Sequence, residues 1–147
     1  MEDSVEREMQ DRIEIVAVLD RYAEALDQRR WGLLEQVFAP DVDFDFGEWS
    51  AHSLPEAVAT IRSYLENCGP SQHLQGNYRV LLDGDRAKSS VYIRASHVGV
   101  GRAAGKSYEM TGEYEDELRR TPAGWRSVKR RARVFFELGS REVLGPG

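Results

Sequence analysis

Cysteine is almost absent from this chain. Cys68 is the only one among 147 residues, so neither an internal disulfide nor a cysteine cluster for a metal ion can form. There is also no run of 18 apolar residues that would cross a membrane, and the N-terminal stretch MEDSVEREMQDR is too charged for a signal peptide. Basic residues are in the minority: 20 Lys and Arg stand against 25 Asp and Glu, a net charge of −5. We therefore expect a cytoplasmic protein with neither a nucleic-acid nor a membrane partner.

The composition and length suit one globular domain, because 41% of the residues are hydrophobic and 31% are charged. Apolar side chains recur at steps of three and four from residue 11 to residue 27, which predicts an amphipathic helix. That stripe consists of Ile13, Val16, Leu19, Tyr22, Ala23 and Leu26. A shorter helix is predicted from Trp31 until Pro40 stops it, a strand over 41–49, and a third helix over 55–67.

The period changes to two after Ser71. The pattern predicts long strands over 71–82, 86–98, 106–119 and 125–136, joined by short loops, and therefore an antiparallel meander. Helices followed by a curved antiparallel sheet define an α+β fold in which the helices cover one sheet face. The bases of the last strand fall on both faces, which indicates a bulge or a partner surface there; they are Arg126, Lys129, Arg130, Arg131 and Arg133.

Two histidines flank the first predicted hairpin of the sheet. A three-residue loop over 83–85 pairs His73 with Ala95 and leaves His97 diagonal to His73 on the same face. Shifting that loop by one residue puts the histidines directly opposite each other, and a two-residue loop puts them on opposite faces. Gly84 suits the positive φ that three-residue loops need, so the same-face arrangement is favoured.

The shared face of these histidines points toward the helices, because His97 has the parity of the apolar positions of its strand. His73 shares its face with Gln75 and Asn77, so the concave side is predicted to hold a polar-lined pocket for a small ligand. The alternative for each histidine is a hydrogen-bonded core residue.

Asp27 stands at the end of the first predicted helix, where the helix dipole disfavours a carboxylate. A buried imidazole N–H would compensate for that position. The alternative is that Asp27 caps the next helix at residues 30–31, a frequent role for aspartate.

At several places the chain resembles a SnoaL-like domain of the nuclear-transport-factor-2-like, or cystatin-like, cone fold. The resemblance covers roughly residues 8–138, and we take 1–147 as a single domain of this kind. The residues that carry it are Tyr22 to Asp27, Arg30-Trp31, Leu34, Phe38 to Asp41, Gln72-His73-Leu74, Asn77, Asp83 to Ala87, Gly112-Glu113-Tyr114, Asp116 and Gly124-Trp125-Arg126. At these positions the chain is similar to scytalone dehydratase, bile-acid 7α-dehydratase and hexachlorocyclohexane dehydrochlorinase.

This resemblance implies a lyase that eliminates a leaving group from a carbon beside an acidic C–H, without metal or organic cofactor. The matching catalytic residues are Asp27, His73, Tyr22 and His97. His73 would be the general base, oriented by Asp27, while Tyr22 and His97 would donate hydrogen bonds to a carbonyl or a departing hydroxyl. A small cyclic, polyketide- or steroid-like substrate would lie in a pocket lined by Trp31, Phe44, Phe46, Gln75, Asn77, Tyr108, Met110 and Tyr114.

Two other functions stay open at this point. One is an isomerase or polyketide cyclase of the ketosteroid-isomerase kind, in which an aspartate is the base. The other is a non-catalytic assembly protein like the small subunit of a ring-hydroxylating dioxygenase. A metal site is not expected, because His73 and His97 lack a third ligand. We expect a homodimer or a homotrimer.

Overall fold

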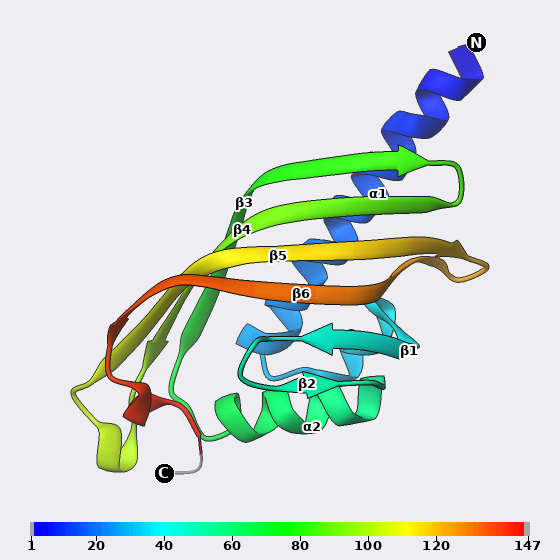
Figure 1. Ribbon diagram of the computed structural model, residues 1–147. Coiled ribbons are helices and arrows are strands. Elements are labelled where there is room, and N and C mark those ends of the chain that lie inside the picture. Colours follow the sequence, from blue (N-terminus) through cyan, green and yellow to red (C-terminus); the bar gives the residue numbers. More distant parts are fainter. Residues whose placement is uncertain (1, 146–147) are drawn as a thin grey trace.

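A six-stranded sheet forms the body of the molecule, and its long strands curve around the helices (Figure 1). The computed structural model describes residues 2–145, and the strand order is β2-β1-β6-β5-β4-β3. Strands β3 (Ser71–Asp83), β4 (Arg86–Val98), β5 (Ser107–Thr121) and β6 (Gly124–Gly139) form an antiparallel meander. The predicted α+β layout with its curved sheet is confirmed.

The segment before the sheet differs from its prediction. Trp31–Gln36 is a short 3-10 helix, η1, and strand β1 (Phe38–Asp45) runs through Pro40 instead of a helix stopping there. β1 pairs with β6 in parallel and with the two-residue β2 (Ser50–Ala51) in antiparallel orientation. Pro40 is tolerated because the β1–β6 register is interrupted around it, so no ladder hydrogen bond from its nitrogen is needed.

Helix α1 (Glu2–Asp27) begins nine residues earlier than the predicted start at residue 11. Its first turns are exposed and project past the sheet (Figure 1). Ile13, expected on the apolar face of the helix, is 62% exposed, because the buried stripe lies on a face that is rotated about the helix axis. Asp11 occupies that stripe instead, buried against the guanidinium of Arg120, whose nitrogens lie 2.6 and 2.8 Å from its oxygens. The stripe consists of Ile15, Val18, Leu19, Tyr22, Ala25 and Leu26.

Helix α2 (Leu54–Leu65) closes the other side of the core. It begins at an N-cap, Ser53, whose hydroxyl accepts a hydrogen bond from the backbone of Glu56, and Pro55 lies in its first turn. Within residues 2–145, no helix combines the length and the apolar character that crossing a bilayer requires.

The turn of the β3–β4 hairpin differs from the favoured one. Asp83 pairs with Arg86, so the loop contains only Gly84–Asp85. A loop of two residues would by itself place His73 and His97 on opposite faces of the hairpin.

A bulge in β3 reverses that effect. Gly76 and Arg79 are both paired, but two residues of β3 lie between them where β4 has one. Asn77, one of the two, has a φ of +54°, a conformation that asparagine tolerates better than most residues. His73 therefore pairs with Ala95, as predicted, and both histidines point to the concave face.

β6 carries two further irregularities in its pairing with β5, which leave Phe135 and Val128 as extra residues. Each of these bulges interrupts the alternation of the strand, which explains why its basic residues occupy both parities. A bulge was one of the two explanations expected from the sequence. Between the two bulges the chain turns Arg130 inward, where its side chain is fully buried.

Candidate active site

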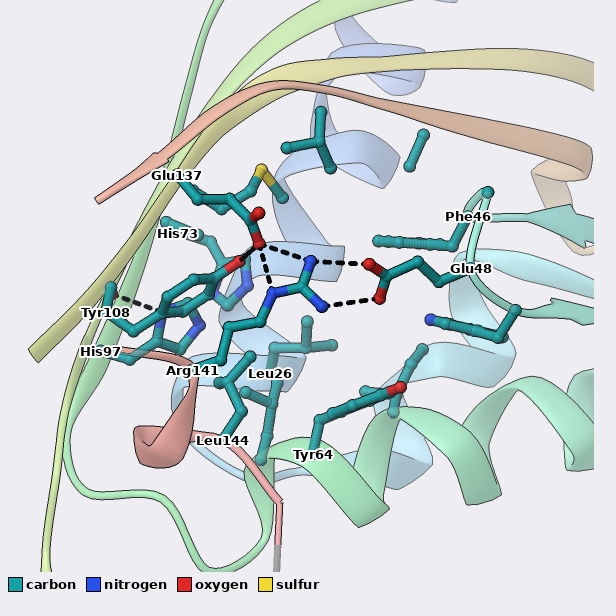
Figure 2. Close-up of a pocket in the computed structure, with 18 of the residues that line it drawn as sticks. Leu26, Phe46, Glu48, Tyr64, His73, His97, Tyr108, Glu137, Arg141 and Leu144 are labelled. Carbon is teal, nitrogen blue, oxygen red and sulfur yellow. Dashed lines mark hydrogen bonds and ion pairs between the residues drawn. The ribbon is translucent and has the colours of Figure 1, made fainter. Parts of the chain in front are cut away.

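A cavity of about 610 Å³ opens between the concave face of the sheet and the helices. Its size is usual for a small-molecule site. Figure 2 shows side chains from the end of α1, from α2, from the β1–β2 turn, from the inner face of the sheet and from η3 (Arg141–Val143) converging on it. Most of the lining is apolar or aromatic, and the polar groups fall into three clusters.

The first cluster joins the end of α1 to the start of β3. His73 Nδ1 lies 2.7 Å from Asp27 Oδ1, and the backbone N–H of His73 donates to Asp27 Oδ2 over 2.7 Å. The Ser71 hydroxyl donates to Oδ1 over 3.0 Å. Burial alone would raise the pKa of Asp27, but the hydrogen bonds from His73 and Ser71 outweigh it and leave that pKa below its usual value. Asp27 therefore contacts His73 and does not cap η1, whose N-cap position is Arg30 without a side-chain bond.

Arg29, which carries no functional signal in the sequence, holds this junction together. It follows α1 with a φ of +56°. Its guanidinium donates to the carbonyl of Leu26 over 2.7 Å, to the hydroxyl of Ser71 over 2.8 Å and to the carbonyl of Gly69 over 2.6 Å. These bonds fix the last turn of α1 against the first residues of β3, so Asp27 reaches His73 across 46 residues of sequence.

The geometry assigns the protons of the imidazoles. A carboxylate only accepts hydrogen bonds, so Nδ1 of His73 carries the hydrogen and Nε2 carries the lone pair in the neutral ring. His73 lines the cavity, and within residues 2–145 its ring forms its hydrogen bond through Nδ1, which leaves Nε2 free. An imidazole in this state can accept a proton from a ligand.

His97 lies beside His73, with ring centroids 5.5 Å apart in an edge-on arrangement. Its Nδ1 lies 3.0 Å from the backbone oxygen of Tyr108, and a carbonyl also only accepts, so Nδ1 carries the hydrogen. Burial lowers the pKa of His97 to about 4. At neutral pH Nε2 is therefore an acceptor, whereas the resemblance implied a donor at this position.

The second cluster lies deeper, around Tyr22. Tyr22 is 1% exposed, and its ring stands edge-on to His73, with centroids 6.4 Å apart. Burial raises the pKa of Tyr22 and of Tyr114, so both hydroxyls stay protonated as possible donors. Arg130, which sequence reasoning missed, lies 4.3 Å from the Tyr22 ring centroid and 4.5 Å from that of Tyr114. Asp116 binds Arg130, whose Nε lies 2.9 and 3.1 Å from the two carboxylate oxygens.

The third cluster, formed by Arg141, Glu137, Glu48 and Tyr108, lines the cavity. Its only signal in the sequence is the i, i+4 spacing of Glu137 and Arg141. Arg141 Nη2 lies 2.6 Å from Glu137 Oε1 and 2.8 Å from Glu48 Oε1. The Tyr108 hydroxyl donates to Glu137 over 2.5 Å. Figure 2 shows the guanidinium of Arg141 between the carboxylates of Glu137 and Glu48. The cluster carries two negative charges and one positive charge.

The predicted pocket residues divide into two groups. Tyr108, Met110, Tyr114 and Phe46 line the cavity, as predicted. Trp31, Phe44, Gln75 and Asn77 do not.

Different packing removes each of these four from the cavity. Phe44 is fully buried behind the wall, where it stacks on Phe46. Trp31 lies on η1 against the guanidinium of Arg62. Gln75 turns toward α1 and donates to a backbone carbonyl there over 2.9 Å, and the bulge exposes Asn77 to solvent.

Within residues 2–145, no three His, Cys, Asp or Glu side chains gather closely enough to hold a metal ion.

Known proteins match most of the chain. Residues 7–131 match the family model of the SnoaL-like domain. Uncharacterized proteins of Mycobacterium tuberculosis and Mycobacterium bovis are 34% identical over 126 residues, which is 84% of this chain and 84% of each relative.

Solved structures with low sequence identity share the fold. A protein of Kribbella flavida is similar with a TM-score of 0.83 at 22% identity, covering 92% of this chain and 97% of that one. A candidate scytalone dehydratase of Novosphingobium aromaticivorans gives 0.80 at 17%, covering 94% and 91%. The hexachlorocyclohexane dehydrochlorinase LinA-type3 of Novosphingobium barchaimii gives 0.79 at 15%, covering 90% and 92%. The chain thus shares its fold with a candidate dehydratase and a dehydrochlorinase, and it belongs to the SnoaL-like family.

Proposed function

We propose that the protein is a cofactor-independent lyase that eliminates water or a related leaving group from a small cyclic, polyketide- or steroid-like substrate. The observation that carries the proposal is the contact of 2.7 Å between Asp27 Oδ1 and His73 Nδ1 at the wall of a cavity of about 610 Å³. It leaves a basic Nε2 facing space that a flat, mainly apolar molecule fits.

The reaction follows from these groups. His73 Nε2 takes a proton from a carbon beside a carbonyl, the electron pair of that C–H bond becomes a C=C bond, and the bond to the leaving group breaks. Asp27 stabilises the imidazolium that forms and keeps the ring in the required tautomer. The hydroxyl of Tyr22 or Tyr114 can donate to the oxygen on which negative charge develops. When the leaving group is hydroxide, the His73 imidazolium passes the proton to it, so that water departs and His73 is neutral again.

The related folds support this class of chemistry, because both a dehydrochlorinase and a candidate scytalone dehydratase are among the similar structures. Fold similarity at this identity does not carry an activity over. The proposal therefore depends on the geometry around His73.

The test compares two variants with a matched control. His73→Ala and Asp27→Asn should each lower turnover by at least about 10²-fold, the usual loss of a general base. His52 provides the control, because it forms an equally short contact with Asp43, 2.8 Å, at the surface, where the two side chains are 77% and 55% exposed. His52→Ala should leave turnover unchanged. Wild-type rates in both dyad variants would refute the proposal.

The product distinguishes the alternative functions. An isomerase or cyclase converts its substrate without loss of mass, whereas the lyase releases water or hydrogen halide, so mass spectrometry of the product separates them. Absence of turnover with every hydroxylated ring compound of suitable size would favour the assembly-protein alternative.

We also propose that the chain forms a homodimer or a homotrimer. Exposed apolar side chains on the sheet support it: Leu74 is 62% exposed, and Tyr92 packs on Phe135 with centroids 6.1 Å apart while each is nearly half exposed. Analytical ultracentrifugation of the wild type and of Tyr92→Glu would test this, and a monomeric wild type would refute it.

A further inference from the structure

The two imidazoles that line the cavity offer a ligand only hydrogen-bond acceptors. His73 and His97 each use Nδ1–H internally, one on the carboxylate of Asp27 and the other on the backbone oxygen of Tyr108. Each ring therefore offers only a lone pair on Nε2. Within residues 2–145, each ring forms its hydrogen bond through Nδ1, and neither Nε2 is among the fully buried atoms that lack a partner. Both rings line the cavity, so each Nε2 is accessible from it. Both nitrogens are thus open to a ligand.

The donors of the third cluster are already engaged. The Tyr108 hydroxyl donates to Glu137, and the Arg141 guanidinium donates to Glu137 and Glu48. A ligand carbonyl, ether or halogen placed beside His97 would meet another electron-rich atom. A ligand hydroxyl would instead form a hydrogen bond, so the complementary group at this position is a donor.

We propose that His97 is a specificity-determining residue whose Nε2 accepts a hydrogen bond from a hydroxyl of the substrate that the reaction retains. This inference rests on the proposed function only in taking the cavity as the substrate site. The low pKa of His97, about 4 through burial, keeps the nitrogen unprotonated at neutral pH.

The hydroxyl bound by His97 is retained in the product because His97 Nε2 can only accept a hydrogen bond. A hydroxyl that leaves gains negative charge on oxygen and needs a hydrogen-bond donor, whereas an acceptor such as His97 Nε2 opposes its departure. The leaving group therefore lies elsewhere, near the donors Tyr22 and Tyr114. Because the rings of His73 and His97 are 5.5 Å apart, the retained hydroxyl lies close to the carbon that His73 deprotonates. The substrate class is accordingly a ring compound with at least one hydroxyl beyond any that is eliminated.

The charges of the third cluster narrow this class. Glu48 and Glu137 outnumber Arg141 and occupy its guanidinium from two sides. A ligand carboxylate would have to displace one of them and would face the other. A neutral hydroxylated compound avoids both costs, so phenols and alcohols should bind and aromatic acids should not.

Binding of two matched probes tests the proposal without requiring turnover. We expect 2-naphthol, which has a donor, to bind the wild-type protein about five- to tenfold more tightly than 2-methoxynaphthalene, which keeps the oxygen and loses the donor. Isothermal titration calorimetry measures both constants. His97→Phe should abolish this preference, whereas His73→Phe should retain it.

These variants separate the two proposals. A preference that survives in His97→Phe and disappears in His73→Phe would overturn the role of His97 and leave His73 as the base. Equal binding of both probes to the wild type, or no binding of 2-naphthol at millimolar concentration, would also overturn it.

Imidazole ¹⁵N NMR of the wild type gives a second measurement that does not depend on the folding of a variant. The Nε2 resonance of His97 should have the downfield position of an unprotonated nitrogen. It should move upfield when 2-naphthol is added and stay in place with 2-methoxynaphthalene. A protonated Nε2 in the free protein would refute the proposal.

Discussion

Mild acid should destabilise this protein through the buried imidazole of His97. His97 is 5% exposed, and burial lowers the pKa of its imidazole from 6.5 to about 4 in the folded protein. In the unfolded chain the same group keeps the ordinary value. Between these two pKa values the unfolded chain binds more protons than the folded one, so the free energy of unfolding falls as the pH falls through the window from about 6.5 to about 4.

The magnitude follows from the two pKa values. At pH 7.5 the ring is neutral in both states and contributes almost nothing. At pH 5 the unfolded chain is largely protonated at this site and the folded one is not, which is worth about 2 kcal/mol. Asp27 does not contribute in this range, because its lowered pKa affects stability only below about its usual value of 3.8.

Urea unfolding measured by circular dichroism at a series of pH values tests this expectation. His97→Gln keeps a neutral polar side chain that does not titrate, and it provides the comparison. Between pH 7.5 and pH 5 the wild type should lose about 2 kcal/mol more than the variant. Parallel stability curves for the two proteins would show that His97 is not held neutral, and the assignment of its Nε2 as an acceptor would fail with it.

Three further predictions concern the fold, and thermal and urea unfolding measure them all. Asp116→Asn should cost about 3–5 kcal/mol, because it leaves Arg130 as an uncompensated buried cation, whereas Asp116→Leu combined with Arg130→Met should cost far less; equal losses would contradict this. Gly112→Ala should cost about 1–3 kcal/mol or more, since its Cβ would lie 2.2 Å from the backbone oxygen of Arg133, and a neutral result would refute the tight packing of β5 on β6. Asn77→Val should cost about 1–2 kcal/mol while Asn77→Gly stays close to wild type, because φ is +54° there; equal stability of the two variants would argue against the bulge.

Local patterns were sufficient for most elements of the fold. The switch from a period of 3.6 to a period of two after Ser71 predicted four strands within a few residues of their observed bounds, because side-chain alternation depends only on neighbouring residues. The same alternation placed His97 and Tyr114 on the inner face. The resemblance of short motifs to SnoaL-like domains supplied Asp27 and His73, whose contact is now seen at 2.7 Å.

The sheet face of His73 depends on two local irregularities that offset each other. The expected three-residue loop is a two-residue turn, and the bulge at Asn77 restores the register that the turn would have changed. The predicted partner of His73 was therefore correct although the predicted loop was not. A bulge is defined by the pairing of its strand with a neighbouring strand, which the sequence of one strand does not contain.

Other parts of the site depend entirely on contacts between distant segments. Arg130 points inward because the bulge at Val128 shifts the register of β6 against β5. Arg141 contacts Glu48, which is 93 residues away in the sequence. The protonation of His97 depends on a backbone oxygen of the neighbouring strand and on the burial of the ring. The sequence by itself thus determined the elements and the residue types at the site, since these follow from local spacing. Only the tertiary structure decided which charges face one another, and whether each imidazole offers a proton or a lone pair, because those properties arise from neighbours that folding brings together.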